Sequence, residues 1–182
     1  GTDTEHLWSF IRKVQWPVMI ESLSNLRTEV PEDCLLYVIS TYDSILKNER
    51  FKRNVTPDTV IRFGAQPVSK FLMQFITQAA PKNFVVIEED PMFRDSTHMA
   101  THFIHAKVGD WLEEMAIANT RTEQAFAQFW KMADLLALDT IEKYRDHATD
   151  EGAMVSAMLA SLPACVDIFV SSSMPIRDID TF

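Results

Sequence analysis

One β-α-β unit over residues 59–95 constrains the fold of this chain more than any other stretch. An apolar run of strand length ends at Gly64, a helical pattern opens at Pro67, and a second apolar run occupies residues 84–87. Both strand runs are continuously apolar, which is typical of a parallel sheet covered by helices on both faces. The sequence therefore predicts an α/β fold with a Rossmann-like parallel sheet flanked by helices.

The turn inside this unit is the candidate ligand site, because open α/β sheets bind ligands beyond the carboxyl ends of their strands. Gly64 permits a tight exit from the strand, and Pro67 suits the first helical position. The free amides of Val68, Ser69 and Lys70, together with the Lys70 ammonium, would then hold an anion. From the turn alone, a solvated lysine beside an ordinary turn is the favoured interpretation. The chain has four glycines and only one at this turn, so the dinucleotide fingerprint of three is absent and NAD or FAD binding is rejected.

Composition excludes several classes of protein. The chain has 182 residues, 47% of them hydrophobic, which fits one globular domain with room for part of a second. A net charge of -9 argues against a nucleic-acid or membrane surface, although a local basic pocket remains compatible with it. We find no signal peptide, transmembrane run or lipidation motif, so a cytoplasmic protein is expected. Cys34 and Cys165 are expected to be buried reduced thiols.

The first part of the chain alternates between helical and strand patterns. We predict a helix over residues 1–14, a short strand over residues 16–21, and a loop in which Arg27 faces the same rim as Gly64. Residues 34–39 alone could form a strand, but the spacing and length of the pattern from Pro31 to Leu46 favour a helix. Because a strand should precede the first helix of a β-α-β protein, this domain is expected to lack its first strand.

Three histidines follow the central unit at helical spacing. His98, His102 and His105 invite a metal-site interpretation, but residues 101–105 form a strand pattern, in which neighbouring side chains face opposite ways. Hydrogen-bonded loop and edge histidines are therefore the favoured interpretation. A helix over residues 108–117, with Trp111, Leu112 and Met115 inward, is expected to close the first domain.

The last third of the chain is predicted to be mostly helical. A long amphipathic helix spans residues 121–147, with its apolar side formed by Phe126, Phe129, Trp130, Ala133, Leu136, Leu138, Ile141 and Tyr144. It serves either as an interdomain strut or as a packed surface helix, and the sequence leaves both open. A helix over residues 150–161, a buried strand over residues 166–170 and a polar turn follow.

Two segments resemble a known family. Ser173-Met-Pro-Ile-Arg177-Asp-Ile-Asp180 is similar to the S-M-P-I-R-D signature of the 2-succinyl-5-enolpyruvyl-6-hydroxy-3-cyclohexene-1-carboxylate (SEPHCHC) synthases, thiamin diphosphate enzymes of menaquinone biosynthesis. The earlier part of the chain resembles that family's middle domain. The matching residues are Trp16, Pro17, Tyr42, Asp43, Pro57, Asp58, Arg62, Phe63, Gly64, Pro67, Val68, Ser69, Lys70, Asp90, Arg94, Asp95, Thr97 and His98.

The resemblance implies a transferase with three α/β domains. Such enzymes decarboxylate 2-oxoglutarate on thiamin diphosphate, held through Mg²⁺, and add the carbanion to isochorismate; they form homodimers or tetramers. Lys70, Ser173 and Arg177 match substrate-binding positions of the family. The resemblance assigns no catalytic, cofactor-binding or metal-binding residue to this chain. The chain alone is expected to be inactive. Some members carry arginine where this chain has Phe71, which is a departure from the family pattern beside Lys70.

This resemblance also implies a domain division. Residues 1–119 are expected to form the Rossmann-like middle domain, residues 120–148 a connecting helix, and residues 149–182 the truncated β-α start of the diphosphate-binding domain. Two alternatives stay open. One is a nucleotide-independent α/β module that binds a small carboxylate or phosphate at the turn between Gly64 and Lys70, and the other is the middle domain of another thiamin diphosphate decarboxylase.

Overall fold

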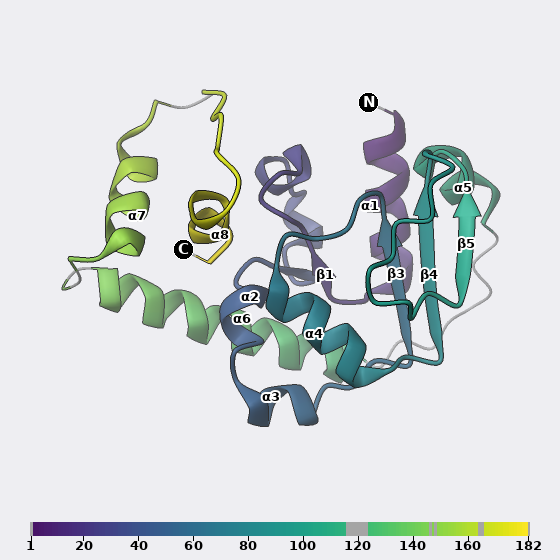
Figure 1. Cartoon of the computed structure of the whole chain (residues 1–182), viewed down its shortest axis with the longest axis horizontal. Coiled ribbons are helices and arrows are strands. Elements are labelled where there is room, and N and C mark those ends of the chain that lie inside the picture. Colours follow the sequence, from purple (N-terminus) through teal and green to yellow (C-terminus); the bar gives the residue numbers. More distant parts are fainter. Residues whose placement is uncertain (1, 116–123, 146, 148, 164–165, 182) are drawn as a thin grey trace.

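The computed structural model describes residues 2–115, 124–145, 147, 149–163 and 166–181. Its strands form two parallel sheets, one of two strands and one in the order β3-β4-β5 (Figure 1). The strands are β1 (Val18–Met19), β2 (Val38–Ile39), β3 (Thr59–Phe63), β4 (Asn83–Glu88) and β5 (His102–His105). The predicted α/β fold with parallel sheets and flanking helices is confirmed.

The predicted β-α-β unit is present as β3, α4 (Lys70–Ala79) and β4. β3 and β4 run parallel, with Thr59 opposite Asn83. Gly64 leaves β3 with a φ of 75°, in the left-handed region that glycine adopts without strain. The helix begins later than predicted, at Lys70 instead of Pro67. The reason is the Ser69 side chain, whose Oγ accepts the Leu72 amide at 3.1 Å and so caps the helix.

Helices cover both faces of the three-stranded sheet. On one face, α1 (Thr2–Val14) and α5 (Val108–Glu114) pack together around Phe10 and Leu112. The opposite face buries Phe84 and Val86 under α4, with Trp130 of α6 (Gln124–Arg145) in the same core cluster. The apolar side chains of β3 and β4 are thus buried or partly buried on both faces of the sheet, as predicted, and Arg62, the one charged residue within β3, is buried with them.

The prediction of one helix from Pro31 to Leu46 is wrong. This segment contains the 3₁₀ turn η2 (Glu32–Cys34), strand β2 and the short helix α2 (Tyr42–Ile45), followed by α3 (Glu49–Arg53); a further 3₁₀ turn, η1 (Asn25–Thr28), precedes it. Val38 and Ile39 pair in parallel with Val18 and Met19. Burial on both faces and strand pairing outweigh the helical spacing, as expected for β-branched residues that a neighbouring strand can pair with.

The C-terminal elements also differ from their prediction. α6 is confirmed within the described residues, and it leads away from the sheet to α7 (Glu151–Ser161) and α8 (Met174–Thr181) at the far side of the molecule (Figure 1). The predicted buried strand over residues 166–170 is wrong, because this segment is irregular and Phe169 is fully exposed. The predicted polar turn after it is helix α8. Met115, predicted to point inward, is 37% exposed.

Candidate functional site

The candidate site lies where β1, β2 and β3 end, which is the edge at which parallel sheets bind ligands. The segments that follow these strands contain Glu21, Thr41 and Gly64. Helix α8 packs onto α2 beside this edge, so a segment distant in sequence joins it. Figure 1 shows α8 beside the central helices and remote from β5.

Glu21 occupies part of the predicted anion site. Its Oε1 accepts a hydrogen bond from the amide of Val68, one of the groups expected to receive an anion. Burial raises the pKa of the Glu21 carboxyl, the Val68 bond opposes this shift, and the charge of Asp180 adds to it. The predicted cradle of three free amides is therefore wrong at Val68, because the chain's own carboxylate binds there.

A pH-dependent effect on stability follows from Glu21. A carboxyl group with a raised pKa in the folded state binds more protons than in the unfolded state, so stability falls as pH rises from about 4.3 through the raised pKa. We expect Glu21→Gln to remove this fall while its amide oxygen still accepts the Val68 amide. Urea unfolding at several pH values checks this, with exposed Glu29→Gln as control. An unchanged pH slope in Glu21→Gln would contradict the assignment.

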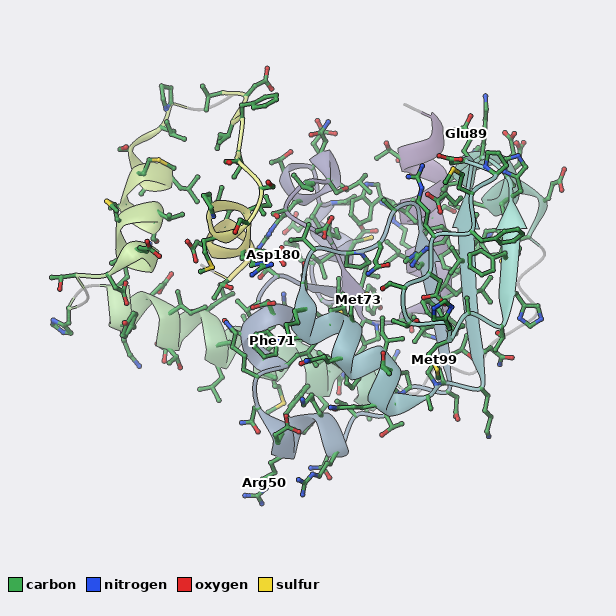
Figure 2. The ribbon with its side chains drawn as sticks, viewed as in Figure 1. Arg50, Phe71, Met73, Glu89, Met99 and Asp180 are labelled. Carbon is green, nitrogen blue, oxygen red and sulfur yellow. The ribbon has the colours of Figure 1, made fainter. Side chains whose placement is uncertain are left out.

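Asp180 fastens α8 to the first part of the chain. Its carboxylate is buried and accepts the hydroxyl of Tyr42 at 2.8 Å and the backbone amide of Ser22 at 3.3 Å. Arg27 donates to the same carboxylate at 3.4 Å. Burial, then the Asp180 charge, raises the pKa of Tyr42 above its ordinary value, and the phenol stays protonated as a donor. In Figure 2, Asp180 lies on the side of α8 that faces the central helices.

Asp43 forms a second link at the same edge. One of its carboxylate oxygens accepts the hydroxyl of Ser69 at 2.6 Å, and the other accepts that of Thr181 at 3.0 Å. The Lys47 ammonium lies 3.1 Å from the second oxygen and 5.3 Å from the centre of the Phe71 ring. Buried carboxylates are stable only with such partners.

Lys70 lies beside this network at the first position of α4. Its side chain is exposed and lines an open groove of about 460 Å³ together with Gln66, Gln74 and Gln78. The groove is polar and has one cation, which is suited to a single carboxylate or phosphate group. The exposure of Lys70 and the open space around Gly64, where an added Cβ would meet nothing within 4 Å, keep this edge accessible.

Ser173 and Arg177 lie on α8 and the turn that starts it. Ser173 has a φ of 82° directly before the helix, and Arg177 is exposed on the helix. The side chains of Lys70, Ser173 and Arg177 form no hydrogen bond or ion pair with any residue that the structure describes. What connects their segments is Asp43, since it binds Ser69 beside Lys70 and Thr181 at the end of α8.

The remaining candidate residues lie elsewhere. His98, His102 and His105 are exposed, the first before β5 and the other two at its start and end. Within the described residues, no group of three or more His, Cys, Asp or Glu side chains could hold a metal ion. Cys34 is buried and free, as predicted, whereas Cys165 lies outside the described residues. No described helix has the length and hydropathy that a membrane crossing requires.

The fold is that of an α/β protein with parallel strands, and the edge at which β1, β2 and β3 end is accessible. A family model described as "Middle domain of thiamine pyrophosphate" matches residues 2–170. The chain belongs to this family, the middle domains of thiamine pyrophosphate (thiamin diphosphate) enzymes. The resemblance found in the sequence is therefore confirmed.

Three relatives that share this stretch bear the same name. The chain is 57% identical over 182 residues to 2-succinyl-5-enolpyruvyl-6-hydroxy-3-cyclohexene-1-carboxylate synthase of Lysinibacillus sphaericus, covering 100% of this chain and 32% of the relative. The proteins of that name from Bacillus cytotoxicus and Bacillus velezensis are 33% and 31% identical and are covered over 30% and 31% of their length. The chain thus spans about a third of the length of these relatives.

Proposed function

We propose that this chain is part of a SEPHCHC synthase, a thiamin-diphosphate-dependent transferase of menaquinone biosynthesis. The identity of 57% across the whole chain is the observation that carries the proposal. The complete enzyme would decarboxylate 2-oxoglutarate and add the resulting carbanion to isochorismate. Fold alone would not support this choice, because many activities share α/β folds.

In this proposal, residues 1–119 are the middle domain, residues 120–148 connect it, and residues 149–182 begin the diphosphate-binding domain. Lys70, Ser173 and Arg177 bind substrate carboxylates. An ammonium group serves as a compact charge, while a guanidinium can bind a carboxylate through two parallel hydrogen bonds. The exposure of Lys70 and Arg177, and the connection of their segments through Asp43, support this assignment.

Thiamin diphosphate and Mg²⁺ are the proposed cofactors of the complete enzyme. The cofactor supplies the electron sink on which decarboxylation depends. Metal sites for Mg²⁺ need oxygen ligands in octahedral arrangement, and the described residues offer no cluster of this kind. In this proposal, the contacts with the cofactor come from other parts of the complete enzyme. The part of this chain is to bind and orient the substrate carboxylates. A cytoplasmic homodimer or tetramer completes the proposal.

Substitution of the two cations in the complete enzyme tests the proposal. We expect Lys70→Ala and Arg177→Ala each to raise the KM for a carboxylate substrate by about tenfold or more, since a hydrogen bond to a charged group contributes about 1.5–3 kcal/mol. SEPHCHC formation from 2-oxoglutarate and isochorismate, with thiamin diphosphate and Mg²⁺ present, is the measurement. Lys82→Ala is the matched control, because Lys82 is 81% exposed and pairs with equally exposed Asp58.

Two outcomes would contradict the proposal. The first is a complete enzyme that forms no SEPHCHC under these conditions. The second is a KM for both substrates that stays at the level of Lys82→Ala in both variants, which would remove Lys70 and Arg177 from the substrate site. Calorimetric titration of the chain with 2-oxoglutarate, isochorismate and adenine nucleotides tests for a module of another class: a response to nucleotide without any response to the two carboxylates would favour such a module.

A further inference from the structure

Asp43 stands out because its two oxygens bind two segments that the sequence separates widely. One oxygen accepts the hydroxyl of Ser69, and the other accepts that of Thr181, which lies at a sequence separation of 138 residues. Asp43 is 7% exposed; its bond to Ser69 is buried, and its bond to Thr181 is partly buried. A buried carboxylate in this position holds its partners more firmly than an exposed one would.

On the α4 side, the link reaches the backbone of the helix start. The Ser69 hydroxyl donates to Asp43 at 2.6 Å and accepts the amide of Leu72 at 3.1 Å. Asp43 thereby orients the capping hydroxyl, because a hydroxyl has one proton to donate and Asp43 takes it. Lys70 is the residue directly after this cap, so the direction of its side chain depends on where the cap sits.

On the α8 side, the link holds the helix face that carries Arg177. Thr181 is the last residue of α8 and lies four positions after Arg177, which places both on one side of the helix. The hydroxyl of Ser44 donates to the Thr181 carbonyl at 3.4 Å, which adds a second contact from α2. Movement of this helix end would therefore move Arg177 relative to α2.

We propose that Asp43 is a positioning residue that couples the start of α4 to the end of α8, so that Lys70 and Arg177 are presented to the substrate together. The identity of the ligand, a molecule with at least two carboxylates, rests on the proposed function. The coupling itself rests on the observed hydrogen bonds of Asp43. Lys47 balances the charge of Asp43 at 3.1 Å, so the carboxylate is buried as an ion pair.

Thr181→Val tests the coupling because it removes one bond and keeps the shape of the side chain. In the ligand-free chain, we expect it to shift the amide NMR signals of Lys70 and Leu72 and to speed hydrogen exchange at Leu72 by about two- to tenfold, the range that loss of one hydrogen bond gives. Thr140→Val is the matched control, since the Thr140 hydroxyl donates to the backbone carbonyl of Leu136 at 2.7 Å within the same helix. Unchanged signals at Lys70 and Leu72 in Thr181→Val would overturn the proposal.

The complete enzyme gives a second readout, which separates this inference from the proposed function. Thr181→Val is expected to raise the KM for a carboxylate substrate by about two- to tenfold in the wild-type background and to have less effect when Lys70→Ala is already present. Equal effects in both backgrounds would overturn the coupling. An ineffective Lys70→Ala, combined with the expected NMR changes, would instead refute the substrate assignment and leave the coupling supported.

Discussion

Replacing Asp134 with alanine is expected to lower the free energy of unfolding by about 3–5 kcal/mol, the range for removing one partner of a buried ion pair. Asp134 is 0% exposed on α6, and its Oδ1 accepts the backbone amides of Ser40 at 2.9 Å and Thr41 at 2.8 Å. Its Oδ2 lies 3.0 Å from the Lys131 ammonium. The alanine variant leaves the amides and the ammonium without this partner, and urea unfolding followed by circular dichroism measures the loss.

Asp139→Ala is the matched control for this experiment. Asp139 lies on the same helix and pairs with Lys143 at the i, i+4 spacing, but its side chain is 54% exposed. Exposed pairs of this kind contribute about 0.3–0.5 kcal/mol. If Asp134→Ala lowered stability by no more than Asp139→Ala does, the network that joins α6 to the start of α2 would not stabilise the fold.

The β-α-β unit could be predicted because its signals are local. A continuous apolar run, a glycine at its end and a helical pattern after it all lie within a short stretch, and each favours the same structure. Residues 31–46 could not be predicted in this way. Their apolar spacing fits a helix, and only the pairing of Val38 with Val18 on another strand favours the extended form. Pairing partners distant in sequence are not visible in a local pattern.

The candidate site was predictable only in part, for a related reason. Lys70 and Arg177 were found through motifs, whereas Asp43 and Asp180 owe their burial to partners that the fold brings together. Tyr42 and Asp180, for example, are separated by 138 residues. Asp134 did leave a signal, because it lies four positions after Trp130, where the helical spacing requires an inward side chain. A single acidic residue at an apolar position of a helix indicates a buried, partnered carboxylate.

The buried face of the long helix α6 could not be predicted from the sequence. The predicted apolar side contains Phe129 and Trp130, yet the structure buries Trp130 and leaves Phe129 at 47% exposed. Toward its end, Leu136 and Tyr144 are also exposed at 68% and 50%. Both faces of this helix are partly apolar, so periodicity alone does not select the one that packs on α3 and α4.

Trp130→Ala is accordingly expected to cost about 3–5 kcal/mol, the usual range for truncating a buried tryptophan. The side chain is 1% exposed, and its ring lies 4.8 Å from that of Phe51 and 5.9 Å from that of Phe75, both in edge arrangements. Truncation loses these ring contacts and leaves a cavity where α3, α4 and α6 meet. Chemical unfolding followed by circular dichroism measures the change without relying on tryptophan fluorescence.

Two comparison variants make this prediction specific. Phe129→Ala, at the neighbouring and half-exposed position, is expected to cost less than about 2 kcal/mol, because its main contact is a stacked ring of Phe51 at 5.4 Å. Trp130→Phe is expected to retain more stability than Trp130→Ala, because the indole nitrogen has no hydrogen-bond partner among the described residues and phenylalanine refills most of the space. Equal losses of stability in Phe129→Ala and Trp130→Ala would contradict the packing of α6 through Trp130. They would also contradict the burial of Asp134, which lies one turn after Trp130 on the same face.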